Sequence, residues 1–159
     1  MHLPTLPALQ LSLRAAIAAA LAFWIAELLG AHYAIYALVA AVIVTDLSPA
    51  TSRRLGLQRM AGTIVGAAGG AAMTYLVPSG PLALGAAIGL AMLTTLFLRL
   101  EASAARVAGY VAAIVMFTYG EHPWLYAFDR AWETLVGLGT AMLVGMVPLW
   151  LRQRNDERS

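Results

Sequence analysis

The sequence predicts an all-α integral membrane protein with six transmembrane helices. Of its 159 residues, 61% are hydrophobic and only 11% are charged, and the mean hydropathy is +0.77. This composition leaves too little polar surface to cover a soluble globular protein. The apolar residues fall into six runs, and most prolines and most charged residues lie between them. Each run is therefore interpreted as one membrane span.

The composition also excludes several classes of function. The chain has no cysteine, which excludes disulfides, zinc–thiolate sites, thiol catalysis and iron–sulfur clusters. It has no nucleophile elbow, nucleotide-binding loop or metalloprotease motif, so we expect no enzyme, no cofactor and no metal. The net charge of +2 comes from arginines beside apolar runs. Such arginines indicate membrane topology, and we expect no nucleic-acid binding.

The first two spans are expected at 11–29 and 33–47, joined by a tight turn at residues 30–32. A secretory signal peptide is the competing interpretation of the first run. Glu27 argues against it, because the cleavage region of a signal peptide is small and neutral. We therefore interpret the run as a retained span.

The third span is expected at 59–77, after a helix-start signal. Ser48 suits the N-cap and Pro49 the first helical position. The helix is therefore expected to begin as a cytoplasmic turn and to enter the membrane near Arg59. A Pro-Ser-Gly-Pro turn then breaks the chain before the fourth span, 82–98.

The fifth and sixth spans are expected at 107–119 and 130–151. Residues 120–129 between them are interpreted as an interfacial loop because they carry three amphipathic rings: Trp124, Tyr126 and Phe128. Residues 1–151 thus form one six-helix membrane domain, and residues 152–159 form a charged cytoplasmic tail.

The loop charges indicate the orientation. With six spans, every arginine except Arg130 falls on one side of the membrane. The positive-inside rule assigns that side to the cytoplasm. The protein is therefore expected to be a multi-pass protein of the inner (plasma) membrane with both termini cytoplasmic.

Glycines recur at four-residue spacing along several spans. Because lipid tails compete with side chains for apolar contact, stripes of small residues let a second helix approach closely. Six glycines are expected to pack helices in this way: Gly62, Gly66, Gly70, Gly85, Gly89 and Gly137.

One motif occurs twice. Arg59 is followed by threonine four residues on and by glycine seven residues on, and the same spacing starts again at Arg130. With six spans, these two segments enter the membrane from opposite sides. The halves are therefore predicted to form an inverted 3+3 repeat, related by an axis in the membrane plane. Chance similarity among alanine, valine and glycine is the alternative explanation.

The stretch 33–70 opens with Tyr33 and Tyr36 and continues with R-R-x-G-x-x-R-x-x-G-T-x-x-G. It resembles the membrane domain of fusaric acid resistance proteins and aromatic acid exporters, which is similar to the membrane part of aluminium-activated malate transporters. With the second motif at Arg130, the resemblance covers nearly the whole chain. It implies export of aromatic carboxylic acids. Family members typically have two six-span halves and this chain has one, so the resemblance also implies a homodimer.

An organic anion that crosses hydrocarbon needs cations, hydroxyl groups or helix N-termini in place of water. The expected substrate-binding residues are therefore Arg59, Thr63, Arg130 and Thr134. The alternative is that both arginines only anchor the helices at the membrane interface, with Arg130 in a local ion pair to Asp129 or Glu133.

Two carboxylates are candidates for proton coupling, because burial raises the pKa of a carboxyl group toward neutrality. Glu27 lies near the outer end of the first span, and Asp46 lies near the inner end of the second. The alternative roles of Asp46 are to cap the third span or to pair with Arg53 or Arg54.

The leading hypothesis is a secondary exporter of aromatic or other organic acid anions that works as a homodimer in the lipid bilayer. A passive anion channel at a dimer interface is the second, suggested by the similarity to malate channels. A non-transporting membrane assembly subunit is the third.

Overall fold

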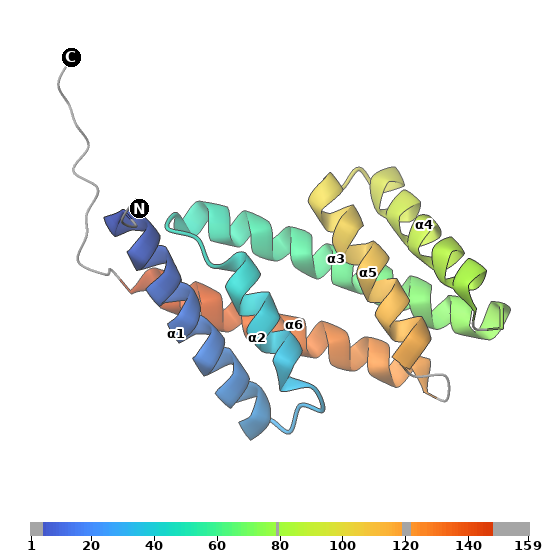
Figure 1. Ribbon diagram of the computed structural model, residues 1–159, viewed down its shortest axis with the longest axis horizontal. Coiled ribbons are helices and arrows are strands. Elements are labelled where there is room, and N and C mark those ends of the chain that lie inside the picture. Colours follow the sequence, from blue (N-terminus) through green and yellow to red (C-terminus); the bar gives the residue numbers. More distant parts are fainter. Residues whose placement is uncertain (1–4, 79, 119–121, 148–159) are drawn as a thin grey trace, which may run out of the picture.

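The computed structural model describes residues 5–78, 80–118 and 122–147, and every regular element within them is an α-helix. In chain order these are α1 (Leu6–Leu28), α2 (Ala34–Val44), α3 (Pro49–Leu76), α4 (Pro81–Phe97), α5 (Ala102–Thr118) and α6 (Pro123–Met146), as labelled in Figure 1. The predicted all-α class is confirmed.

Helix α3 begins where the sequence predicts. Ser48 is its N-cap, the Ser48 hydroxyl accepts a hydrogen bond from the Thr51 N–H at 3.5 Å, and Pro49 opens the helix. The fixed φ of proline suits this position, where its missing N–H has no partner to lose. The result is a helix of 28 residues with Arg59 well inside it.

The predicted interfacial loop at 120–129 is wrong where the structure describes it. Helix α6 begins at Pro123, so the aromatic residues that follow lie on its first turns. Pro123 acts as Pro49 does, as a helix starter. Residues 119–121, the end of the predicted sixth span at 148–151, and the predicted tail lie outside the described residues.

By length and composition, α1 is the one described helix that is suited to cross a membrane on its own. Helices α2, α4 and α5 are apolar but shorter, with 11, 17 and 17 residues. At 1.5 Å per residue α2 is about 16 Å long, which is half the thickness of a bilayer core. Helices α3 and α6 are long enough, but their buried arginines, threonines and glycines make them less apolar.

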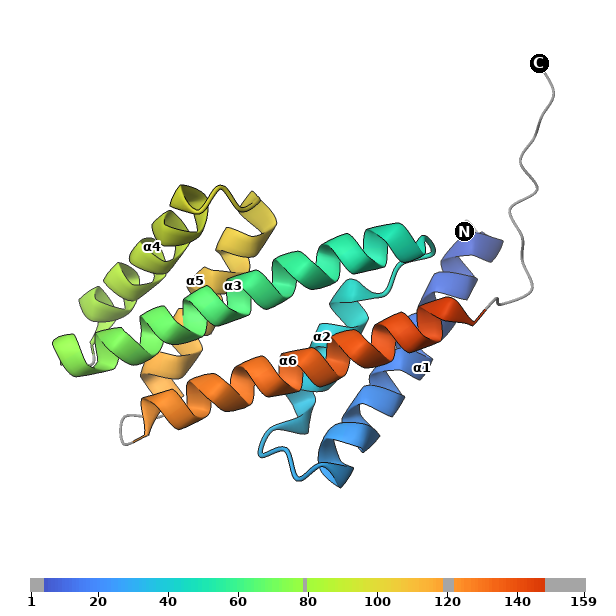
Figure 2. The ribbon, with the colours of Figure 1, turned by 180° about the vertical axis from the view of Figure 1, so that it is seen from behind.

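The two long helices organise the molecule. Helices α3 and α6 pack against each other and run in opposite directions along the long axis (Figure 1). The hairpin α1–α2 packs on α6 and the hairpin α4–α5 packs on α3. Figure 2 shows both hairpins behind the α3–α6 layer. Each hairpin therefore rests on the long helix from the other half of the chain.

Small residues make these crossings close. A Cβ on Gly62, Gly66 or Gly70 would overlap backbone atoms of α5, and a Cβ on Gly137 would overlap Ala37 of α2. Backbones pack directly against each other at these four positions, which is how helices associate in lipid. Gly85 and Gly89 on α4 differ, because nothing lies within 4 Å of a Cβ placed on either.

The residues that meet at the two crossings are related by one constant separation in sequence. Gly66 meets Ala108 and Gly137 meets Ala37, and both pairs are related by the 71 residues that separate Arg59 from Arg130 (130 minus 59). All five buried positions of α2 are buried again in α5 at this separation. Nine of the ten buried positions of α3 recur in the same way in α6.

The interior is built from small side chains and the exterior from large ones. Ten alanines on α1, α2 and α3 are buried, together with the four crossing glycines. Large apolar side chains instead point outward, and Leu82, Phe97 and Phe117 are each more than 80% exposed. A soluble protein buries such side chains, so this distribution suits an apolar solvent.

Candidate functional site

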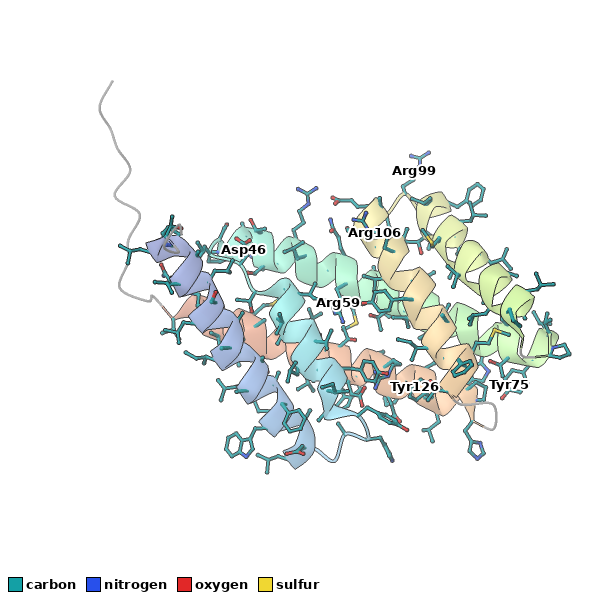
Figure 3. All side chains as sticks on the ribbon, in the orientation of Figure 1. Asp46, Arg59, Tyr75, Arg99, Arg106 and Tyr126 are labelled. Atoms are coloured by element: carbon teal, nitrogen blue, oxygen red, sulfur yellow. The ribbon has the colours of Figure 1, made fainter. Side chains whose placement is uncertain are left out.

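Arg59 is a buried cation without an acidic partner. It lies on α3 in the middle of the molecule, between α2 and α5 (Figure 3), and its side chain is 5% exposed. Its Nη1 donates a hydrogen bond to the Tyr110 hydroxyl on α5 at 2.8 Å, while its buried Nε has no partner. No carboxylate pairs with it within the described ranges. A buried cation left in this state is unusual, because charges removed from water are normally paired.

Arg130 on α6 is equally buried, and its Nε and Nη1, like the Nε of Arg59, have no hydrogen-bond partner, but it differs from Arg59 in having a carboxylate beside it. Its Nη2 forms an ion pair with Glu133, one turn on in the same helix. Its guanidinium carbon lies 3.1 Å from the ring centroid of Tyr36, 4.9 Å from that of Tyr126 and 5.4 Å from that of Tyr33. The charge is therefore compensated by one carboxylate and surrounded by three aromatic faces.

Glu133 also has a second role. Its Oε1 accepts a hydrogen bond from the Tyr33 N–H at 2.8 Å, at the start of α2. The free N–H groups of a helix N-terminus favour a carboxylate, so Glu133 ties α6 to α2 while it neutralises Arg130. At 1% exposure it is among the most completely buried side chains of the molecule.

The structure buries all four predicted substrate-binding residues but does not bring the two arginines to a common partner. Thr63 and Thr134 are buried one turn after their arginines. Arg59 contacts α5 through Tyr110, whereas Arg130 contacts α2 through Tyr33 and Tyr36. The arginines thus occupy two separate sites.

The two proton-coupling candidates lie outside these sites. Glu27 is exposed on the last turn of α1. Asp46 shapes the turn before α3: its Oδ1 accepts from the Ser48 N–H at 2.8 Å, and its own N–H donates to the Ser52 hydroxyl at 3.0 Å. The buried carboxylate next to a candidate cation is Glu133.

Arg14, which was expected only to mark the topology, is buried within α1. Its two Nη groups donate to the carbonyls of Leu47 at 3.4 Å and Val147 at 3.3 Å, beyond the ends of α2 and α6. Cations are favoured at helix C-termini, so Arg14 fastens three helices together. The available signal in the sequence was a single cation inside the first predicted span.

An exposed ion pair links α3 to the loop before α5. Arg54 donates to Glu101 Oε1, at 3.1 Å from its Nε, and this hydrogen bond lowers the pKa of the Glu101 carboxyl from 4.5. The pair is therefore present at neutral pH and lost as the pH falls through the lowered pKa. We expect Arg54→Gln to raise the Glu101 pKa in an NMR titration. Arg53→Gln, on the next residue, is expected to leave that pKa unchanged.

In the described part of the chain, no three histidine, aspartate or glutamate side chains come together as a metal site would require. What the structure offers instead is two buried cations on glycine-lined helix crossings.

Comparison with known families shows which family the chain belongs to. Residues 21–144 match the family described as fusaric acid resistance protein-like, which is most of the chain. The chain belongs to this family. No curated protein and no solved structure gives a match.

The fusaric acid resistance protein-like family is associated with membrane transport and resistance, and not with enzyme chemistry. Membership confirms the family that the arginine–glycine motif indicated, and it makes the protein a membrane protein. The exposed leucines and phenylalanines of the described helices are then the surface that meets lipid.

Proposed function

We propose that this fusaric acid resistance protein-like chain is a secondary exporter of aromatic or other organic acid anions. The observation that carries the proposal is the burial of cations on α3 and α6, the helices at the centre of the molecule. Arginine within membrane helices is rare and marks the path of an anion or a structural pair. Since the given sequence has no nucleotide-binding motif, the proposed transport draws on an ion gradient or on a partner protein.

The architecture of the exporter is an inverted 3+3 repeat in the inner membrane, with both termini cytoplasmic. Three findings support the repeat. The two long helices are antiparallel, each hairpin packs on the long helix of the other half, and buried positions recur at a separation of 71 residues. In transporters built this way, substrate binds near the midplane between the repeats.

The exporter functions as a homodimer. Gly85 and Gly89 on α4 support this, because both are open to neighbours although they have the spacing of a helix-packing pair. Within one copy, the glycines that have this spacing on α3, which are Gly62, Gly66 and Gly70, already pack against α5. A second copy in the bilayer is the partner we propose for α4.

Transport is tested by the flux of 4-hydroxybenzoate into proteoliposomes, with and without an imposed pH gradient. We expect saturable uptake that is driven above equilibrium by the gradient and is lost in Arg59→Gln. Arg53→Gln, which removes an exposed arginine from the same helix, is the matched control and retains uptake.

Two results would contradict the exporter. Flux that never exceeds equilibrium and does not saturate identifies a passive channel. Absence of flux from folded wild-type protein removes transport altogether and favours the assembly subunit.

A further inference from the structure

The two buried arginines are equivalent in position but differ in the residue one turn later. Arg59 is followed at i+3 by Gly62, and Arg130 is followed at i+3 by Glu133. The i+3 position faces corresponding neighbours in the two halves. A Cβ on Gly62 would overlap the Ala104 carbonyl of α5, and Glu133 accepts a hydrogen bond from the Tyr33 N–H at the start of α2. Tyr33 and Ala104 are themselves 71 residues apart (104 minus 33).

The difference follows from where the crossing helices begin. Helix α5 begins at Ala102, so its backbone already fills the space beside position 62. Helix α2 begins at Ala34, which is later than the start of α5 once the 71-residue separation is applied. A carboxylate therefore fits against the N-terminus of α2. One half therefore holds a neutral arginine–glutamate pair, while the other holds a lone cation with no room for an acidic residue at i+3.

From this asymmetry we infer that Arg59 and Tyr110 bind the carboxylate of the transported acid, and that Arg130 with Glu133 is a structural pair that binds none. The identity of the substrate in this inference rests on the proposed function. The inference assigns different roles to Arg59 and Arg130, although both lie in the same sequence motif. The transported anion takes at Arg59 the charge-balancing role that Glu133 has at Arg130.

The local geometry suits a carboxylate. The Tyr110 oxygen accepts from Arg59 Nη1, so its own hydrogen is free to point at an anion oxygen beside the guanidinium. Arginine and tyrosine then offer adjacent donors to one carboxylate, in the charge-assisted hydrogen bonds that arginine forms best. Tyr110 is 40% exposed while Arg59 is 5% exposed, so the tyrosine connects the buried cation to the surface.

Arg14, the third buried arginine of the described residues, does not compete for this role. Both of its Nη groups already donate to carbonyl oxygens beyond the ends of α2 and α6. Those two bonds use the helix termini as its negative partner.

The test is carboxylate binding, measured separately from transport. Thermal unfolding of the purified protein in detergent is followed with sodium benzoate, against sodium chloride at equal ionic strength. We expect benzoate to raise the unfolding temperature of the wild type, and Arg59→Gln to weaken its apparent affinity about ten- to a hundredfold, as expected for a lost charge-assisted hydrogen bond. The double variant Arg130→Met/Glu133→Leu is expected to keep the wild-type benzoate response.

A second pair of variants keeps the test decisive if the double variant does not fold. Tyr110→Glu supplies Arg59 with its own carboxylate, so it is expected to abolish the benzoate response without lowering the unfolding temperature. Tyr110→Gln, of similar size and neutral, is expected to retain a weakened response. Equal responses in Tyr110→Glu and Tyr110→Gln would overturn the inference.

Failure of the site and failure of the exporter give different results. Uptake in proteoliposomes that is unaffected by Arg59→Gln leaves the exporter standing and rejects the site. Benzoate stabilisation that needs Arg59, in a protein that carries no flux, supports the site and rejects the exporter.

Discussion

Glu133→Gln is expected to destabilise the protein by about 3–5 kcal/mol, because it leaves the Arg130 charge buried without a counter-charge. The substitution preserves the size of the side chain and removes only its charge. Arg130 is 3% exposed and Glu133 is 1% exposed, so water cannot replace the missing partner. The measurement is the free energy of unfolding in detergent micelles, followed by the loss of helical circular dichroism.

The double variant Arg130→Met/Glu133→Leu separates charge imbalance from lost packing. Replacing a buried ion pair by apolar residues of similar volume is often neutral, so we expect it to recover most of the loss seen in Glu133→Gln. A Glu133→Gln protein as stable as the wild type would mean that Arg130 has another counter-charge.

Gly66→Ala and Gly137→Ala are expected to cost about 1–3 kcal/mol each, because overpacking a close contact forces backbones apart. The added Cβ of each would overlap a backbone carbonyl oxygen, of Ala108 and Ala37 respectively. Because backbone atoms cannot swing aside as a side chain can, the whole crossing has to open. The same unfolding measurement checks both variants, and the two crossings should respond to a similar degree.

Gly85→Ala is the matched control. It also lies in a helix of this chain, but nothing lies within 4 Å of its added Cβ. Alanine is the better helix former by about 1 kcal/mol, so this variant should not lose stability as a monomer. If Gly66→Ala were as stable as Gly85→Ala, the close crossing of α3 and α5 would be excluded.

The elements of this fold were largely predictable because local signals start and stop them. Ser48 and Pro49 mark the start of α3, and prolines and a glycine mark the turn before α4. The same signal was present at Pro123, but the aromatic residues after it suggested an interfacial loop instead. Rings that favour an interface also fit the outer turns of a helix, so composition alone did not separate the two.

The site was less predictable because its partners are distant in sequence. The arginine motif identified Arg59 and Arg130 from one segment each. The Tyr110 hydroxyl, however, reaches Arg59 from a helix 51 positions away. The i+3 spacing made the Arg130–Glu133 pair a stated alternative, but the hydrogen bond from Tyr33 depends on where α2 begins. Such contacts follow from the packing of whole helices, which periodicity does not encode.

Because each hairpin packs on the long helix of the other half, the fold has a consequence for biosynthesis. Helix α3 leaves the ribosome before α5, yet its glycine face packs against α5. The hairpin α1–α2 likewise packs on α6, which follows it in the chain by more than 70 residues and is the last of the described helices. Neither half can complete its packing during its own translation, so the close crossings form only after the whole bundle has been inserted. Until then the unpaired glycine faces are open to other membrane proteins, and a chaperone or insertase that shields them would protect the nascent chain.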